Sequence, residues 1–394
     1  MASSDSGAVT LRQPTVIDTD SSSSFVCDYV AGVNRVLSLP PYLLVDNIGR
    51  NVEVWRFQSD AREPTARAVY DLTSYPDDPI ASLLDVDLHA AFLRRDGHEL
   101  LTVNHYGRAR RFELPAPAVN MRSTGELQLL GDTERVVMAG DCFVASSPRG
   151  EFTNDPPQPG VFLFEPIPPS WGGATSHGTQ RLGGNQVLAD WGVISALAVT
   201  EQANRLAVAA GLRLGVFDLI GCGAGLRLGE CLWEAALSFH CQWLDFDEVE
   251  RLWAGGHRPS AVDTADWDAC RGGGLSAFIV PSGAPHFTIE LPDATAWGYG
   301  ADPLVLALDR RAVYVLGRDG SLHVVDLTSR ASHQLYAALD AHDGVATPSF
   351  GIGHAARRGD WLYAGFSRGG FRVLRYELGE SGDAGGARVY AAHA

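Results

Sequence analysis

A strand-like segment that ends near a large apolar residue recurs seven times along the chain. Each copy is a hexapeptide, such as Val52–Phe57 or Phe371–Tyr376, and its fourth residue is aromatic or aliphatic. These fourth residues are Trp55, Phe112, Phe164, Phe217, Phe278, Val325 and Leu374. Their spacing of roughly 50 residues is typical of the blades of a β-propeller. We therefore expect the five aromatic side chains among them to be buried between blades at equivalent positions.

Further strand-like runs accompany each hexapeptide. A run such as Arg205–Val208 or Trp361–Gly365 comes before it, and an earlier run is clear at Val33–Leu39 and Glu134–Ala139. A fourth run follows the hexapeptide, as at Arg67–Tyr70. Most hexapeptides are reached through a short turn with a glycine, which supplies the positive φ of a tight hairpin. The pattern predicts an all-β fold, a seven-bladed β-propeller with four-stranded antiparallel blades.

The ring of blades must be closed by a terminal strand, because closure removes two exposed sheet edges. Three segments are candidates for that strand: Val9–Leu11, Phe25–Val30 and Ala387–Tyr390. We expect the propeller to span residues 33–378, between an N-terminal segment 1–32 and a C-terminal segment 379–394. A pair of β-sandwiches is the alternative fold, but it does not explain the regular intervals.

Three of the hexapeptides carry a family resemblance. Val52–Phe57 is closest to the sequence that gives the WD-repeat superfamily its name, and Phe217–Leu219 and Val325–Leu327 keep its aspartate–leucine ending. The chain therefore resembles WD-repeat propellers over about residues 30–380, although only Trp55 is a tryptophan and the usual Gly-His dipeptide is not at its regular place. The resemblance implies the fold and identifies no subfamily, and a fold alone does not give a function.

The charge of the chain narrows the choice of partner. The sequence has 31 basic and 47 acidic residues, for a net charge of −16. A protein that binds nucleic acid or an anionic membrane with its whole surface carries the opposite sign. No apolar run approaches the roughly 20 residues of a membrane helix.

All basic residues are arginine, which is typical of a GC-rich genome, and we expect a bacterial source.

The ends and the cysteines of the sequence predict a compartment. The first residues contain neither the basic nor the apolar part of a signal peptide. The six cysteines form no Cys-x-x-Cys pair and are too few for a disulfide scaffold. We therefore expect a cytoplasmic protein with reduced thiols.

Two connections between the second and third strands are longer than the others. They cover 146–160 and 256–273, in the third and fifth blades, so both are expected on the same face of the ring. Long connections on a rigid scaffold often carry function, although they are also tolerated as surface insertions. The candidate partner-binding residues in them are Arg149, Phe152, His257, Arg258, Asp263, Asp266, Trp267, Asp268 and Arg271.

Trp267 is the expected anchor of this surface, because binding hot spots favour tryptophan. Asp266 and Asp268 flank it and would attract a protein partner of basic character. The sequence thus predicts a non-catalytic protein–protein interaction scaffold, a subunit of a larger complex, with no cofactor. The alternative is a propeller-fold hydrolase or lyase with a divalent metal over the central channel. The innermost strands are expected to be mostly apolar or small, with His89 as the main exception.

Other groups of residues have an ordinary structural interpretation. The cysteines and histidines between Cys222 and Cys270 lack the ligand spacing of a zinc site. The acidic run Asp245–Glu248 is predicted to form a hairpin turn rather than a calcium loop. A cluster of arginines could hold a phosphate or an acidic partner, or could discourage edge pairing of strands. Its members are Arg94, Arg95, Arg108, Arg110 and Arg111.

Overall fold

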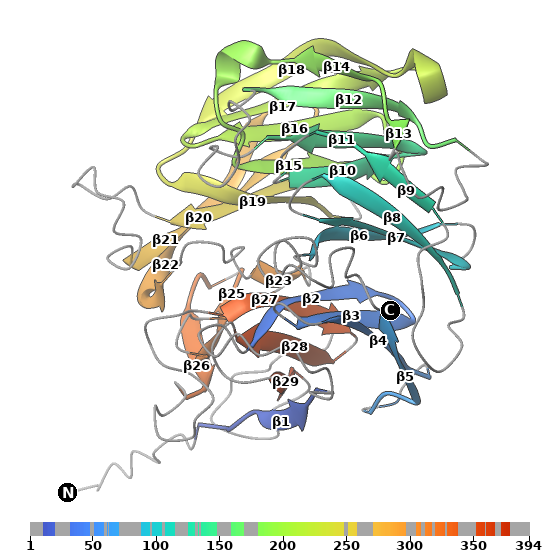
Figure 1. The fold of residues 1–394 in the computed structure, drawn as a ribbon. Helices are drawn as coiled ribbons and strands as arrows, with labels where there is room; N and C mark the ends of the chain where they lie inside the picture. The colour runs from blue at the N-terminus through green and yellow to red at the C-terminus, as the bar shows by residue number, and fades with distance from the viewer. Residues whose placement is uncertain are drawn as a thin grey trace, which may run out of the picture.

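A computed structural model of the chain shows a ring of seven β-sheets (Figure 1). The structure describes the following residues: 11–19, 32–47, 51–58, 61, 63–70, 88–94, 97–104, 107–114, 125–130, 133, 135–147, 159–168, 180–247, 251–257, 271–296, 305–308, 312–316, 320–327, 329–337, 352–358, 360–366 and 372–378.

The first three blades come from the first half of the chain. Blade one contains β2 (Val33–Leu39), β3 (Tyr42–Asn47), β4 (Asn51–Arg56) and β5 (Ala66–Tyr70). Blade two contains β6 (Leu88–Arg94), β7 (Glu99–Asn104), β8 (Arg108–Glu113) and β9 (Gly125–Gln128). Blade three contains β10 (Arg135–Ala139), β11 (Cys142–Ser146), β12 (Val161–Pro166) and β14 (Gly184–Val187).

The remaining blades complete the ring. Blade four contains β15 (Ala196–Val199), β16 (Arg205–Ala210), β17 (Arg213–Ile220) and β18 (Arg227–Ala236). Blade five contains β19 (His240–Phe246), β20 (Arg251–His257), β21 (Arg271–Ile279) and β22 (Ala284–Ala296). Blade six contains β23 (Val305–Leu308), β24 (Ala312–Leu316), β25 (Leu322–Asp326) and β26 (Ser332–Tyr336). Blade seven contains β27 (Ile352–Arg358), β28 (Trp361–Phe366), β29 (Arg372–Glu377) and β1 (Thr15–Asp18).

The apolar core is divided among the seven junctions between blades. Each buried cluster joins one blade to the next, and the cluster of Trp253 and Leu275 with Val313 and Val315 joins blade five to blade six. The repeated anchor residue of each blade packs into the junction with the blade before it. None of the seven anchors is more than 5% exposed. The predicted propeller and the predicted burial of its aromatic anchors are therefore confirmed.

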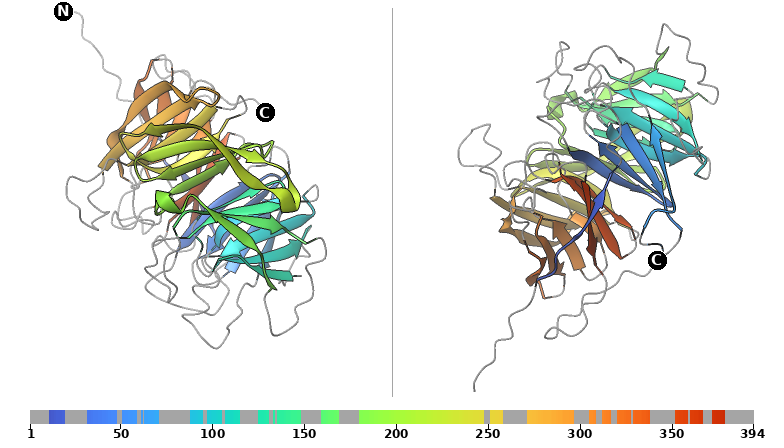
Figure 2. Two further views of the ribbon diagram at one scale, coloured as in Figure 1. Left: turned by 90° about the horizontal axis from the view of Figure 1, so that it is seen from above. Right: turned by 60° about the horizontal axis from the view of Figure 1, so that its bottom comes forward.

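An N-terminal strand closes the ring. β1 pairs antiparallel with β29, with Thr15 opposite Arg375 and Asp18 opposite Arg372. Figure 2 shows the blue β1 beside the red strands of blade seven. Val16 is 46% exposed and Ile17 is 7% exposed, the alternation of a strand that packs one face on a core.

The closing strand is none of the three segments expected from the sequence. Leu11, the described residue of Val9–Leu11, is not in a strand. Phe25–Val30 and Ala387–Tyr390 lie outside the described residues. Residues further along the N-terminal segment close the ring because they bring Ile17 into the core between blades seven and one.

One short strand crosses from its own blade to a neighbour. β13 (Gln180–Arg181) lies between β12 and β14 of blade three in sequence, but it pairs parallel with β9 of blade two. The backbone N–H of Leu182 continues this pairing by donating to the carbonyl oxygen of Gln128 at 2.9 Å. The outer edge of blade two is thereby covered by a segment of blade three.

Helical structure in the described residues is limited to two single turns, η1 (Ala189–Trp191) and η2 (Gly223–Gly225). No helix among these residues is long and apolar enough to cross a membrane.

The alternation of strand direction gives the ring two distinct faces. The second strand of each blade ends, and the third begins, on the face where each blade also connects to the next. We call this the loop face, and the other the opposite face. Gly211 marks the loop face of blade four: its φ of +62° allows the tight turn from β16 to β17.

Candidate functional site

The two long connections begin at the loop face, where β11 and β20 end. Seven of the nine predicted partner-binding residues in them lie outside the described residues: Arg149, Phe152, Arg258, Asp263, Asp266, Trp267 and Asp268. Arg271 begins β21, where the structure describes its backbone. His257 is described in full, as the last residue of β20. The described part of the site is therefore the base from which the long connections extend.

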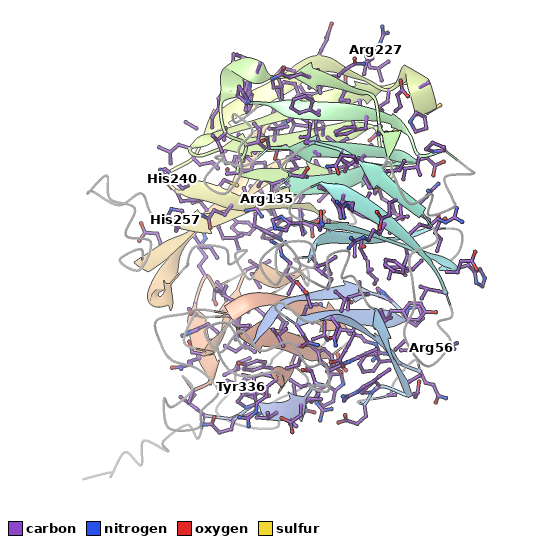
Figure 3. All side chains as sticks on the ribbon, viewed as in Figure 1. Arg56, Arg135, Arg227, His240, His257 and Tyr336 are labelled. Atoms are coloured by element: carbon purple, nitrogen blue, oxygen red, sulfur yellow. The ribbon has the colours of Figure 1, made fainter. Side chains whose placement is uncertain are left out.

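His257 lies at the start of the connection in blade five. It stands opposite His240 of β19 on one side and opposite Gly273 of β21 on the other. The two imidazole rings stack with their centroids 5.3 Å apart and their planes 30° apart (Figure 3). His257 is only 3% exposed. Burial lowers the pKa of His257 to about 4, and the neighbouring His240 lowers it further in the same direction. The His257 ring is therefore neutral near pH 7.

Two glycines let the strands approach closely beneath this histidine pair. A Cβ atom on Gly256 would lie 1.7 Å from the carbonyl oxygen of His240. A Cβ atom on Gly274 would lie 2.2 Å from the Phe239 ring. Any side chain at these positions would push the strands apart. The base of the blade-five connection is thus closely packed.

The position of His257 recurs in other blades. The last residue of the second strand is Asn47 in blade one, Asn104 in blade two and Ser146 in blade three, and each is buried. The Asn104 Oδ1 accepts the backbone N–H of Arg108 at 2.8 Å, across the turn into the third strand. Similarly, the Asn47 Nδ2 donates to Asn51 Oδ1 at 2.8 Å. In blades one and two, the buried asparagine at this position bonds across the turn that follows it, which the hexapeptide alignment did not reveal.

A chain of hydrogen bonds links three blades on the loop face. Arg135 of blade three donates from Nε to the carbonyl oxygen of Ser195, at the start of blade four, at 2.8 Å. The Ser195 Oγ accepts the backbone N–H of Gly211 at 3.2 Å. The Gly211 carbonyl oxygen then accepts the N–H of Cys241 in blade five at 2.8 Å. Figure 3 labels Arg135, at one end of this chain of contacts, and His240, the residue before Cys241 at the other end.

Two exposed apolar side chains lie on the loop face of blade four, between the blades that carry the long connections. Val193 is 38% exposed in the connection from blade three, and Leu212 is 41% exposed in the turn after Gly211. The backbone N–H of Gly160, just before β12, donates to the carbonyl oxygen of Gly192 at 3.0 Å. The end of the blade-three connection is thus attached beside Val193.

The cysteines and histidines considered as zinc ligands are the next group of candidate residues. No group of three or more His, Cys, Asp or Glu side chains among them is arranged to hold a metal ion. Burial raises the pKa of Cys241 to about 12, so its thiol stays protonated. Cys241 is buried and the adjacent His240 is only half-buried, as expected for neighbours on opposite sides of a strand.

The acidic run in blade five lies at the end of a strand: Asp245 is in β19, Asp247 follows that strand, and Glu248 lies outside the described residues. Asp247 Oδ1 accepts the backbone N–H of Arg251 at 2.9 Å, and its Oδ2 accepts Trp253 Nε1 at 3.0 Å. Burial alone would raise the pKa of Asp247, but these hydrogen bonds and the Arg251 guanidinium hold it below its usual value. Asp247 therefore supports the hairpin between β19 and β20.

The arginine cluster is engaged in ion pairs between strands. Arg94 lies 3.3 Å from Glu99 and 2.6 Å from Asp141. Arg111 lies 3.6 Å from Glu99, and Arg110 lies 3.0 Å from Glu126. These arginines are on the first and third strands of blade two, not on its outer edge, and Arg95 lies outside the described residues. Their contacts favour a structural role over either interpretation offered from the sequence.

The innermost strands are more polar than expected. Besides His89, they carry Arg35 in β2 and Arg135 in β10. Arg35 donates from a terminal guanidinium nitrogen to the carbonyl oxygen of His89 at 2.8 Å. Both arginines therefore reach from the innermost strand of one blade to the backbone of the next.

Comparison with known proteins agrees with this architecture. The chain is a seven-bladed propeller whose fold is similar to that of the solved β-propeller domain of Cps50 (Swd1) from Myceliophteria thermophila. The TM-score is 0.57 at 11% sequence identity, and the match covers 88% of this chain and 97% of the other. At this identity the likeness shows the fold alone. No family model matches the chain, and no curated protein is detectably similar to it in sequence.

Proposed function

We propose that the protein is a non-catalytic scaffold that binds a protein partner of basic character on the loop face. The observation that carries the proposal is the position of the two long connections. They extend from β11 and β20 on the same face, on either side of blade four, whose own turn at Gly211 is tight. Long connections on a rigid scaffold are frequent binding elements.

The described base of this surface supports a binding role. The hydrogen bonds from Arg135 to Ser195 and from Cys241 to Gly211 hold blades three, four and five together. Val193 and Leu212 add exposed apolar surface between the two connections. Apolar surface beside polar, partner-specific elements is typical of protein interfaces. His257 is buried, so we assign it the task of holding the connection rather than touching the partner.

Charge supports the choice of a basic partner. The chain carries a net charge of −16, and Asp263, Asp266 and Asp268 are close to Trp267 in the sequence of the blade-five connection. Two connections between blades, Tyr75–Pro79 and Asp340–Asp343, carry further carboxylates and are also expected on the loop face. Such charges speed the encounter with a positively charged protein.

The test begins with proteins that co-purify with the native chain and bind it in a purified reconstitution. Trp267→Ala should weaken that complex by about 2 kcal/mol or more, the usual effect of removing a hot-spot tryptophan. The melting temperature should stay nearly unchanged. If Trp267→Ala unfolds the protein, or if binding is unaffected, Trp267 is not the anchor.

A matched pair of substitutions tests which face binds. Leu212 lies on the loop face of blade four and is 41% exposed. Ile279, the last residue of β21, lies on the opposite face of blade five and is 43% exposed. Leu212→Ser should weaken the complex, whereas Ile279→Ser should leave it unchanged. The reverse result would place binding on the opposite face. A stoichiometric divalent metal in the purified protein would instead favour the enzymatic alternative.

A further inference from the structure

Two cysteines from neighbouring blades lie near each other on the opposite face. Cys142 is the first residue of β11 in blade three and is fully buried. Cys222 precedes the single turn η2, after β17 of blade four, and is exposed. The Cys142 Sγ lies 3.4 Å from the carbonyl oxygen of Gly223, to which its thiol donates a hydrogen bond. Cys222 therefore directly precedes Gly223, the residue that the Cys142 thiol contacts.

We propose that Cys142 and Cys222 form a redox-sensitive pair, which a peroxide converts into a disulfide between blades three and four. Both thiols are free in the structure. Intracellular disulfides of mesophiles are usually transient and redox-sensing, so a pair of this kind is compatible with reduced thiols at rest. The proposal is independent of partner binding on the loop face.

The segment around Cys222 has open space on the C-terminal side of that residue, whereas Gly221 on its other side lies close to the Gly225 carbonyl oxygen. It reads Gly-Cys-Gly-Ala-Gly over residues 221–225. A Cβ atom on Gly223 would meet only Pro166, at 3.5 Å, and one on Gly225 would meet no atom within 4 Å. Glycines without close neighbours can change backbone conformation at little cost. The proposed disulfide therefore requires a rearrangement of this segment, in which Cys222 lies one residue from Gly223, about 3.8 Å between Cα atoms.

The other described cysteines are poor partners for Cys222. Cys231 is also exposed, but it lies in the middle of β18, opposite Phe217. Arg227, the residue opposite Ile220, is four residues away from Cys231 along this strand. At about 3.4 Å per residue, this places Cys231 roughly 13 Å from the end of the hairpin where Cys222 lies. Cys241 is buried in blade five, toward the loop face.

The exposure of the two thiols sets the order of the chemistry. The accessible Cys222 thiolate attacks a peroxide, the O–O bond breaks, hydroxide leaves and Cys222 becomes a sulfenic acid. The Cys142 thiolate then attacks the Cys222 sulfur, the S–O bond breaks and a second hydroxide leaves. Two thiols and one hydrogen peroxide thus give one disulfide and two waters. A dithiol reductant reverses the change by thiol–disulfide exchange.

The second step should depend on pH. Burial raises the pKa of Cys142, and the nearby Asp141 and Cys222 raise it further. Only a small fraction of Cys142 is therefore thiolate near pH 7, and disulfide closure should be the slow step. Raising the pH toward that pKa should speed closure, while the sulfenic acid at Cys222 accumulates at lower pH.

The experiment treats the full-length, reduced protein with hydrogen peroxide and maps its thiols by mass spectrometry without reduction. We expect the intact mass to fall by two hydrogen atoms, and a peptide that joins Cys142 to Cys222. Cys222→Ser should abolish this link. Cys142→Ala should leave a sulfenic acid at Cys222 that dimedone traps. Cys231→Ser is the matched control, because it removes another exposed thiol of blade four and should not change the link.

Clear results would overturn the proposal. Oxidation of Cys222 to a sulfinic acid in the wild-type protein, with Cys142 still free across the pH range, would show that the sulfur atoms do not meet. A link from Cys222 to another cysteine would show that Cys142 is not its partner. If Cys142→Ala fails to fold, the wild-type and Cys222→Ser proteins still decide the outcome, because the linked peptide must be present in the first and absent from the second.

Discussion

Arg135 and Ser195 belong to neighbouring blades, and the Arg135 Nε–H donates a 2.8 Å hydrogen bond to the Ser195 carbonyl oxygen. Arg35 makes the corresponding contact from blade one to His89 of blade two. The innermost strands are thereby connected by charged side chains as well as by apolar packing. Hydrogen bonds from charged groups contribute more to stability than neutral ones do.

Arg135→Ala should therefore lower the free energy of unfolding by about 1.5 to 3 kcal/mol, the range for a hydrogen bond with a charged partner. Denaturant unfolding followed by tryptophan fluorescence measures the change. Arg227→Ala, at an exposed position on the outer strand β18, is the control and should have almost no effect. Equal effects of the two substitutions would contradict the role assigned to Arg135.

Phe217→Ala tests the packing between blades three and four. Phe217 is 4% exposed and its ring meets Trp191 edge to face, with centroids 5.4 Å apart. Its removal should cost about 3 to 5 kcal/mol, the usual range for emptying a packed aromatic site. Ile220→Ala, three residues along the same strand but 41% exposed, should cost far less. Calorimetry of both variants compares the two sites.

Closure of the ring can be tested at two adjacent residues of β1. Ile17 is 7% exposed and packs between blades seven and one, whereas Val16 is 46% exposed. Ile17→Ala should destabilise the protein by about 2 to 5 kcal/mol, and Val16→Ala should change stability little. Loss of β1 would also uncover the edge of β29, so we expect Ile17→Ala to self-associate on light scattering. A monomeric, fully stable Ile17→Ala variant would show that β1 is not needed for closure.

The buried His257 predicts a dependence of stability on pH. Its pKa in the folded protein is about 4, below the ordinary value of 6.5, because burial disfavours the charged ring. The unfolded state therefore binds a proton more readily than the folded state. The stabilising contribution is complete above about pH 6.5 and is lost as the pH falls toward 4, with a total of roughly 3 kcal/mol.

The free energy of unfolding can be measured between pH 4 and 6.5 for the wild-type protein and for His257→Gln. The slope of this free energy against pH should differ between the two proteins. The variant should lose less stability on acidification, because its side chain does not titrate. The same slope in both proteins would contradict a neutral, buried His257 in the folded state.

Asp266 and Asp268 should act mainly on the rate of association with the proposed partner. Replacing both by asparagine should slow association at low salt and have little effect at high salt, where surface charges are screened. Stopped-flow or surface-based kinetics over a salt series measures this. A change confined to the dissociation rate would mean that the two carboxylates contact the partner directly.

The repeated architecture could be predicted from the sequence because each blade repeats the same local pattern. A buried anchor such as Phe112 or Leu374 is required once per blade, and its apolar character is preserved where the surrounding residues vary. The turn at Gly211 could likewise be predicted, since positive φ strongly favours glycine.

Features that depend on contacts distant in sequence could not be predicted in this way. β1 is a short strand whose partner β29 lies at the other end of the chain, and only the burial of Ile17 selects it. The pairing of β13 with blade two departs from the repeat. The burial of His257 depends on the stacked His240 and on the close approach permitted by Gly256. Nothing in the local sequence around Trp267 describes its surroundings, so that part of the site stays a prediction.

The pairing of β1 with β29 has a consequence for biosynthesis. Thr15 is synthesised 360 residues (375 − 15) before Arg375, its partner in the sheet. At about 5 to 20 residues per second, the first strand waits roughly 20 to 70 s for its partner. Throughout this time Ile17 has only the blade-one half of its packing site, and the nascent chain carries an incomplete ring. The earliest strand of the propeller is therefore the last to find its partner, and the ring closes only after blade seven has been made.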